Sequence, residues 1–303
     1  MTSQKPAYIK AFNEGLIKSI KEKLISSISA CKLCPRACGV NRLKGETGLC
    51  KTGLYAKVAS YNPHFGEEAP LVGYYGSGTI FFSNCNLLCN FCQNWDISHE
   101  GHGYEVDDEE LAAMMIHLQR LGCHNINFVT PSHVVFQIIS ALEIAIEKGL
   151  SIPLVYNTSA YDSVETIKLL DGVFDIYMPD FKFWDKKVAE ITCHAGDYPE
   201  VARSAILEMH RQVGDLLFDS KGIAKKGLLI RHLVLPQQLS NTKEIMRFIS
   251  EKISRNTYVN IMPQYRPCGR ADEVKELARS LSQEEFDEAL AVAREMGIYR
   301  VDR

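Results

Sequence analysis

The sequence predicts an α/β fold built on parallel strands, because short apolar runs of β type alternate along the chain with segments of helical periodicity. Six such apolar runs are present, and they end near Ser83, Val129, Tyr156, Met178, Leu235 and Met262. Six βα units are therefore the simplest count. Periodicity alone leaves open whether they form a doubly wound sheet or an incomplete barrel.

The N-terminal stretch 1–30 is predicted to be an amphipathic helix, because apolar side chains recur on one face. These side chains are Ile9, Phe12, Leu16, Ile20, Leu24 and Ile28. The stretch lacks the charged-then-apolar design of a secretory signal. The chain has 303 residues, 46% of them hydrophobic, with no apolar run long enough to span a bilayer, so we expect a cytoplasmic enzyme without a membrane partner.

A helix is expected after each strand. Asp107 begins the first of them, with Glu110 placed three residues on as in a capping box. Ser282 and Glu285 form a second such pair at the last helix. The other helices are expected over 134–148, 163–170, 199–213 and 241–253. The connection 179–227 is long enough for a helix plus irregular structure.

Three cysteines, Cys85, Cys89 and Cys92, follow the first strand with the spacing C-x3-C-x2-C. Thiolates this close in sequence can converge on one metal centre with little loop entropy to overcome. A four-iron cluster needs four protein ligands to be closed, so three thiolates leave one iron open to another ligand. A zinc site or unrelated free cysteines are the alternatives, although the usual zinc pattern pairs two C-x-x-C halves.

With the aromatic Phe91 before the last cysteine, this stretch resembles the C-x3-C-x-aromatic-C signature of the radical S-adenosylmethionine (SAM) superfamily. The resemblance implies a [4Fe-4S] cluster whose open iron is chelated by the amino and carboxylate groups of SAM. It also implies that one electron from the reduced cluster breaks the bond between sulfur and the ribose carbon. The resulting 5′-deoxyadenosyl radical abstracts hydrogen from a substrate. A low-potential electron donor such as flavodoxin or ferredoxin is the expected partner.

Residues 75–265 resemble the branch of the superfamily that includes pyruvate formate-lyase activating enzyme. This resemblance implies a partial TIM-type (β/α)6 barrel over 76–270, with SAM across the carboxyl ends of the strands. An N-terminal helix (1–30), a cysteine-rich metal-binding segment (31–75) and a C-terminal helical cap (271–303) are expected around it. A glycyl radical enzyme is then the expected target, and a small molecule, a peptide or RNA is the alternative substrate.

Polar residues at the strand ends are the SAM contacts that the resemblance implies. They are Thr130, Pro131, Asn157, Thr158, Asp180, Lys182 and Arg231. Asp180 and Lys182 look like the Asp-x-Lys element of the activases, and Arg231 lies in a strand similar to their Arg-x-x-x-x-Pro strand. A monovalent cation is also implied, held by Asp180, the Thr158 hydroxyl and the Met178 carbonyl, because alkali ions prefer oxygen ligands. An ordinary surface pair of Asp180 with Lys182 is the alternative.

The sequence departs from the activases at several strand ends. Residues 130–132 stand where those enzymes carry Gly-Gly-Glu, and a turn with Ser132 as a helix cap is the alternative there. Asn157 stands where the family often has aspartate. Tyr265 lies where the activases tend to place histidine, so its contact with SAM is in doubt. His232 is expected to be a structural histidine that faces away from the site.

Four further cysteines, Cys31, Cys34, Cys38 and Cys50, precede the barrel with the spacing C-x2-C-x3-C-x11-C. Because four thiolates can close a site, a second bound metal is predicted here. A structural zinc ion and an auxiliary iron–sulfur cluster both remain open, and free thiols are the alternative. The remaining cysteines are isolated and are expected to be buried apolar side chains: Cys123, Cys193 and Cys268.

Six basic residues against the single acid Glu46 surround the four cysteines: Lys32, Arg36, Arg42, Lys44, Lys51 and Lys57. This local basic face raises the alternative of a nucleic-acid-binding metal module. The whole chain carries a formal charge of −3 and has no aromatic-rich RNA-binding motif, so nucleic acid is not the expected partner. A non-enzymatic iron–sulfur scaffold is a further alternative. The open iron position argues against it, because a scaffold has no need of one. Glu67 and Glu68 are expected in a solvated turn, with a catalytic base as the alternative.

Overall fold

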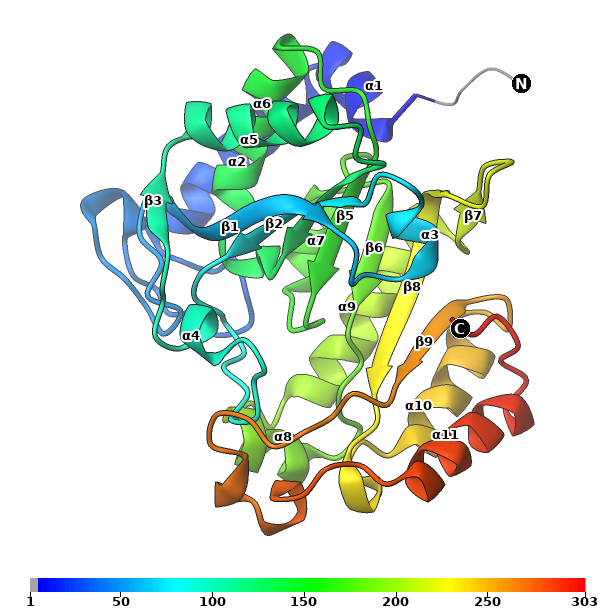
Figure 1. Ribbon diagram of the computed structural model, residues 1–303. Coiled ribbons are helices and arrows are strands. Elements are labelled where there is room, and N and C mark those ends of the chain that lie inside the picture. The colour runs from blue at the N-terminus through cyan, green and yellow to red at the C-terminus, as the bar shows by residue number, and fades with distance from the viewer. Residues whose placement is uncertain (1–4, 303) are drawn as a thin grey trace.

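A computed structural model of the protein describes residues 5–302. It contains a curved sheet with helices against its outer face, shown in Figure 1. The central strands are β2 (Ser77–Phe82), β4 (Ile126–Val129), β5 (Leu154–Thr158), β6 (Ile176–Pro179), β8 (Ala224–Leu233) and β9 (Tyr258–Met262). Each pairs in parallel with the next. The six predicted strands and the partial barrel are confirmed, and within residues 5–302 the sheet does not close.

The helices that follow these strands begin and end close to the predicted positions. They are α5 (Asp108–Arg120), α6 (Val135–Glu147), α7 (Val164–Leu169), α9 (Tyr198–Val213), α10 (Thr242–Phe248) and α11 (Gln283–Glu295). The helix α8 (Lys186–Cys193) was not predicted. Both predicted capping boxes are present, at Asp107 with Glu110 and at Ser282 with Glu285. After α10, residues 249–253 continue as a π-helical turn. The connection 179–227 holds α8, α9 and the short strand β7 (Leu217–Phe218).

The N-terminal helix is divided in two, so the prediction of one continuous helix is wrong. α1 (Ala7–Asn13) and α2 (Leu16–Ser29) are separated at Gly15, whose φ of 74° lies in the left-handed region that glycine enters without steric cost. The break changes the helical phase. The buried face of α2 consists of Ile17, Ile20, Leu24 and Ile28, whereas Leu16 is 37% exposed.

Two antiparallel strands that the periodicity did not indicate extend the sheet beyond β2. β1 (Ala56–His64) pairs with β2, and β3 (Tyr104–Val106) pairs with β1. β1 was hard to recognise because it includes Pro63 and its second half is mostly exposed or half-buried. Since β1 lies within the cysteine-rich segment 31–75, that segment contributes directly to the sheet of the barrel. Short helices α3 (Ala69–Val72) and α4 (Trp95–Ser98) lie on either side of β2 in the chain.

The carboxyl ends of the parallel strands meet at one edge of the sheet, which is where a barrel of this kind places its site. The loop that follows β2 crosses this edge and carries Cys85, Cys89 and Cys92. In Figure 1, α2, α5 and α6 lie on one side of the sheet, and α10 and α11 lie beside β9. No helix within residues 5–302 is both long enough and apolar enough to cross a membrane.

Candidate active site

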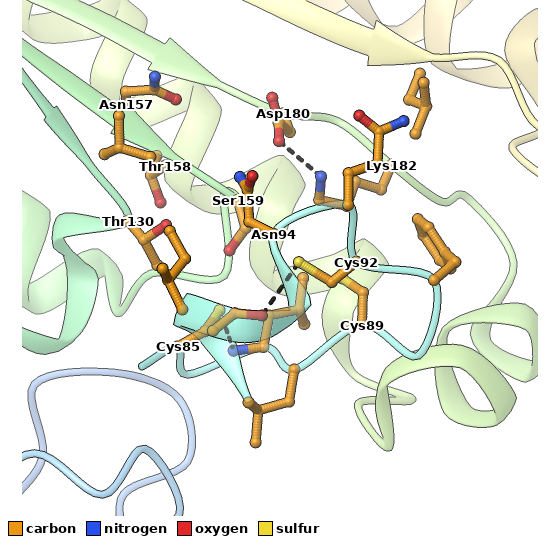
Figure 2. A pocket seen from close by; sticks show the side chains of 18 of the residues that line it. Cys85, Cys89, Cys92, Asn94, Thr130, Asn157, Thr158, Ser159, Asp180 and Lys182 are labelled. Carbon is orange, nitrogen blue, oxygen red and sulfur yellow. Dashed lines mark hydrogen bonds and ion pairs between the residues drawn. The ribbon is translucent and has the colours of Figure 1, made fainter. Parts of the chain in front are cut away.

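The loop after β2 brings its three cysteines to one cavity by two tight turns. Asn84 and Leu88 have φ values of 72° and 56°, so the backbone reverses direction before Cys85 and again before Cys89. The Asn84 N–H donates to the Ile97 carbonyl at 2.7 Å, and the Cys92 N–H donates to the Cys89 carbonyl at 3.1 Å. Cys85, Cys89 and Cys92 all line the same cavity, as Figure 2 shows.

This cavity has a volume of about 260 Å³ and lies at the carboxyl ends of the strands. That volume is near the lower end of the range of small-molecule pockets. Six of the seven predicted SAM contacts line the cavity: Thr130, Asn157, Thr158, Asp180, Lys182 and Arg231. Pro131 is buried and is not among the described lining residues. Ser159, Met262 and Gln264 were not predicted and also line the cavity.

Arg231 and Lys182 share the Asp180 carboxylate. Arg231 Nε donates to Asp180 Oδ1 at 2.7 Å, and Lys182 Nζ donates to Asp180 Oδ2 at 2.6 Å. Arg231 Nη2 also donates to Asn157 Oδ1 at 2.8 Å. All three charged side chains are less than one-fifth exposed. The alternative of an ordinary exposed pair of Asp180 with Lys182 is therefore wrong.

The charges in this network set the ionisation of its members. Burial alone would raise the pKa of Asp180, but the Arg231 guanidinium and the Lys182 ammonium hold it below its ordinary value. Burial alone would lower the pKa of Lys182, and the Asp180 carboxylate raises it. Both cations therefore remain charged at neutral pH and can bind an anionic or oxygen-rich ligand. The monovalent cation stays a prediction, since both oxygens of Asp180 already accept hydrogen bonds from cations.

Glu67 and Glu68 are buried, so the expected solvated turn is wrong. Glu67 Oε2 lies 3.4 Å from Arg231 Nη1, and the Glu67 side chain is 7% exposed. Glu68 accepts a hydrogen bond from Asn260 Nδ2 at 2.8 Å. Burial raises the pKa of Glu67 to about 7, and the negative charges of Glu68 and Asp180 add to this while Arg231 opposes it. Glu67 therefore changes its charge near neutral pH.

The turn after β4 does not contain the helix cap at Ser132 that was the alternative there. Ser132 does not cap the next helix: its hydroxyl bonds that of Thr158 at 3.0 Å, and Val134 is the N-cap of α6. Thr130 has a left-handed backbone with φ of 60° and lines the cavity. Thr158 donates its hydroxyl to Asp162 Oδ2 at 2.6 Å. Thr130 and Thr158 are therefore brought together at the cavity, and the Thr158 hydroxyl is committed to Asp162.

The cysteine sulfurs have hydrogen-bond donors suited to thiolates. The Leu87 N–H donates to Cys85 Sγ at 3.3 Å, and the Ser98 hydroxyl donates to Cys92 Sγ at 3.2 Å. Donors of this kind stabilise sulfur ligands of iron–sulfur clusters. In the metal-free chain, burial raises the pKa of Cys85 to about 12, so binding of a metal must displace protons. The residues fit an iron–sulfur cluster that is open toward the cavity.

Two side chains outside the predicted set adjoin the cysteine loop. Cys193, expected to be an isolated buried thiol, is buried, and its hydrogen bond to Cys89 is the largest cause that raises the pKa of Cys89. Arg36, expected on an exposed basic face, donates to the carbonyls of Asn86 at 3.0 Å and Leu87 at 3.3 Å. No sequence signal located either contact, because both depend on segments distant in the chain.

His232 and Tyr265, which lie near the site, have structural roles. His232 is fully buried between the Phe181 carbonyl and the Thr242 hydroxyl, both at 2.9 Å, so its expected structural role is confirmed. Tyr265 is buried against the Phe91 ring and donates its hydroxyl to the Leu277 carbonyl at 2.7 Å. Tyr265 therefore supports the aromatic residue of the cysteine motif from behind.

The four N-terminal cysteines lie in the segment between α2 and β1. Cys31, Cys34 and Cys50 are buried, and Cys38 is exposed. In the part of the chain from residue 5 to residue 302, no three Cys, His, Asp or Glu side chains converge closely enough to hold a single metal ion. In a four-iron cluster each thiolate binds a different iron, so its four sulfur ligands lie farther apart than the ligands of a single ion. A second metal site stays a prediction.

Comparisons with known proteins agree with this site. A sequence model of the radical SAM superfamily matches residues 79–220, the part of the chain that holds the cysteine loop and the strand ends up to Asp180 and Lys182. Protein MJ0674 of Methanocaldococcus jannaschii is 34% identical over 283 residues, which cover 88% of this chain and 75% of that protein.

A solved structure has a similar fold. The structure of HydG, a maturase of the [FeFe]-hydrogenase, superposes with a TM-score of 0.50 at 16% identity over 74% of this chain. This chain spans half the length of HydG, and the likeness at that identity shows a common fold. The cysteine motif and the match of the superfamily model to residues 79–220 support membership of the radical SAM superfamily.

Proposed function

We propose that this protein binds SAM at a [4Fe-4S] cluster held by Cys85, Cys89 and Cys92 and cleaves it reductively. The observation that carries the proposal is that the three thiols share one cavity with a buried network of charged side chains. When bound, the cluster and SAM supply a 5′-deoxyadenosyl radical for hydrogen abstraction. A flavodoxin or a ferredoxin is the proposed source of the electron.

The role of the charged network is to bind and orient SAM. Asp180 fixes Lys182 and Arg231 in place by one short hydrogen bond each, at 2.6 and 2.7 Å. Both cations also line the cavity, where their remaining N–H groups can bind the carboxylate or the ribose oxygens of SAM. Because the network is largely removed from water, its electrostatic interactions are stronger than those of a surface pair.

As the substrate we propose a glycine of a glycyl radical enzyme. Support comes from the activase-like pattern in which Asp180-x-Lys182 follows β6 and an arginine lies on β8, since these three residues form one hydrogen-bonded unit. The radical would take a hydrogen atom from the glycine Cα, which yields 5′-deoxyadenosine and a backbone radical on the partner. A small molecule, a peptide or RNA is the other class of substrate that the test distinguishes.

The test of SAM cleavage uses the anaerobically reconstituted and chemically reduced protein. We expect 5′-deoxyadenosine to form from SAM and Cys89→Ala to abolish it, because a cluster with two cysteine ligands is not retained. Cys123→Ala is the matched control, since Cys123 is also a buried cysteine but does not line the cavity. Turnover by Cys89→Ala would contradict the cluster assignment.

The test of the substrate is isotopic. A glycyl radical enzyme from the same organism is produced with glycine deuterated at Cα and mixed with the reduced protein and SAM. We expect deuterium in 5′-deoxyadenosine and a glycyl radical signal in the EPR spectrum of the partner. Unlabelled 5′-deoxyadenosine with no radical on the partner would contradict the activase role and leave SAM cleavage standing.

A further inference from the structure

A fully buried arginine lies beside the four N-terminal cysteines. Arg42 is 1% exposed and is the largest of the fully buried side chains in the described part of the chain. Its Nη1 donates to the His133 carbonyl at 2.6 Å, and its Nη2 lies 3.4 Å from Cys50 Sγ. Its Nε has no hydrogen-bond partner among residues 5–302.

This guanidinium has no carboxylate to balance it. None of the ion pairs found among residues 5–302 includes Arg42, and its two hydrogen-bond acceptors are a neutral carbonyl and a sulfur. Arginine does not lose its proton in proteins, so the charge cannot be relieved by neutralisation. A buried charge without a counter-charge is strongly destabilising, and proteins therefore pair such charges or place them against a metal site.

The only acceptor of Arg42 that can carry a negative charge is Cys50. A thiolate that ligates a metal keeps its negative charge. Four thiolates around an iron–sulfur core leave a net negative charge, which is the counter-charge that Arg42 requires.

Backbone hydrogen bonds make the segment around the four cysteines compact. The Cys31 N–H donates to the Val40 carbonyl at 2.8 Å, and the Gly39 N–H donates to the Cys31 carbonyl at 3.0 Å. Cys38 packs directly on Gly48, where a Cβ would lie only 2.7 Å from Cys38 Sγ. Gly48 precedes Cys50 by two residues, so the packing of Cys38 on Gly48 brings the two ends of the cysteine motif close together.

We propose that Cys31, Cys34, Cys38 and Cys50 bind an iron–sulfur cluster, and that the buried Arg42 guanidinium is its counter-ion. Arg42 is a positioning residue here, because it contacts the ligand Cys50. This centre is separate from the one at Cys85, Cys89 and Cys92. A result that overturns it therefore leaves the proposed function unaffected.

The first test is the metal content of a variant that lacks the cavity cysteines. Cys85→Ala, Cys89→Ala and Cys92→Ala are combined in the full chain, which is purified anaerobically and analysed for zinc, iron and sulfide. We expect one iron–sulfur cluster per chain to remain. Iron and sulfide at background in a variant whose circular dichroism matches that of the wild type would overturn the proposal.

If that triple variant does not fold, the wild-type protein answers the same question. Its iron and sulfide are then expected to exceed one four-iron cluster per chain. Cys38→Ser, at an exposed cysteine, is expected to lower only this excess. Iron and sulfide that correspond to one cluster per chain would overturn the proposal.

The second test addresses Arg42 and follows metal release to a chelator. Arg42→Met is expected to speed the release by about 10- to 100-fold, as for other residues that support metal ligands, and Arg42→Lys by less. In the metal-free chain, Arg42→Met should not lower the midpoint of denaturant unfolding, because it removes an unbalanced charge. Unchanged release, or equal destabilisation with and without metal, would contradict the counter-ion role.

Discussion

The two groups of cysteines lie in opposite surroundings. Cys85, Cys89 and Cys92 line a cavity that also exposes charged and polar groups at the strand ends. Cys31, Cys34 and Cys50 are each no more than 5% exposed, and the buried Arg42 guanidinium lies 3.4 Å from Cys50 Sγ. The cavity group is accessible to a ligand, whereas three of the four N-terminal cysteines are enclosed by the protein and only Cys38 is exposed.

Arg36 connects the two groups. It lies between Cys34 and Cys38 in sequence, and its guanidinium donates to the carbonyls of Asn86, Leu87 and Cys193 at 2.8 to 3.3 Å. Arg36 also stacks over the Tyr161 ring at 5.1 Å. The N-terminal segment therefore supports the loop that carries the cavity cysteines from the side opposite the sheet contacts. Substitutions in the two surroundings should therefore have separable effects on SAM binding, stability and the cysteine loop.

Arg231→Met should impair the cavity most strongly. Removal of one partner from a buried charge pair costs roughly 2–5 kcal/mol, which corresponds to a loss of about 30-fold or more in SAM affinity. Arg211→Met is the control, because Arg211 is 57% exposed and pairs with Asp171 and Glu208 on the surface. Equilibrium binding of SAM to the reconstituted protein measures the affinity of both variants. Equal affinities of the two variants would contradict the role of the network.

Glu67→Gln should reduce the pH dependence of the free energy of unfolding, because Glu67 is a buried carboxyl group beside Arg231 of the cavity. The pKa of Glu67 is raised from 4.5 to about 7, so the stabilising proton is fully bound below pH 4.5 and is lost as the pH rises through 7. This lowers the wild-type free energy of unfolding by up to about 3 kcal/mol between those limits. Denaturant unfolding at pH 5 and pH 8 should show a smaller difference in the variant. An unchanged difference would contradict the assignment.

Arg36→Met should loosen the cysteine loop without removing any metal ligand. Each lost hydrogen bond from a charged donor to a buried carbonyl costs about 1–3 kcal/mol. Hydrogen exchange of the amides in 86–92 should accelerate, while the amides of β5 stay protected. Lys32→Met, at an exposed position of the same segment, serves as the control. Loop protection equal to that of the wild type would show that the two cysteine groups are not connected in this way.

Ser98→Ala should have the smallest effect. It removes the hydroxyl that lies 3.2 Å from Cys92 Sγ. Hydrogen bonds to cluster sulfurs stabilise the more negative reduced state, so the reduction potential of the cluster should fall by about 20–60 mV. A spectroelectrochemical titration measures this shift, with Ser204→Ala on the exposed side of α9 as the control. A rise in potential would contradict the expected sign.

The sequence predicted the strands and the cavity cysteines because both depend on local patterns. Apolar runs located all six parallel strands, and the resemblance at Asp180, Lys182 and Arg231 located residues that form one network. Burial of Glu67 and Arg42 was not predictable, since charged residues in loops are usually exposed. Both are buried by segments more than ninety residues away, near Arg231 and His133.

The break at Gly15 and the strand β1 were missed for a different reason. The apolar spacing on either side of Gly15 continues a single helical face, so periodicity alone conceals a left-handed residue between two short helices. β1 is stabilised by antiparallel pairing with β2 rather than by its own apolar pattern. A local glycine conformation decided the break and strand pairing decided β1, and sequence periodicity reports neither.

The central claim is that the cluster held by Cys85, Cys89 and Cys92 leaves one iron open for SAM in the cavity. The most direct measurement is electron–nuclear double resonance on the reduced protein with SAM labelled by ¹⁷O in its carboxylate. The account predicts a hyperfine coupling between the label and the cluster, and its loss in Cys89→Ala. Bound SAM without any such coupling in the wild-type protein would contradict the account.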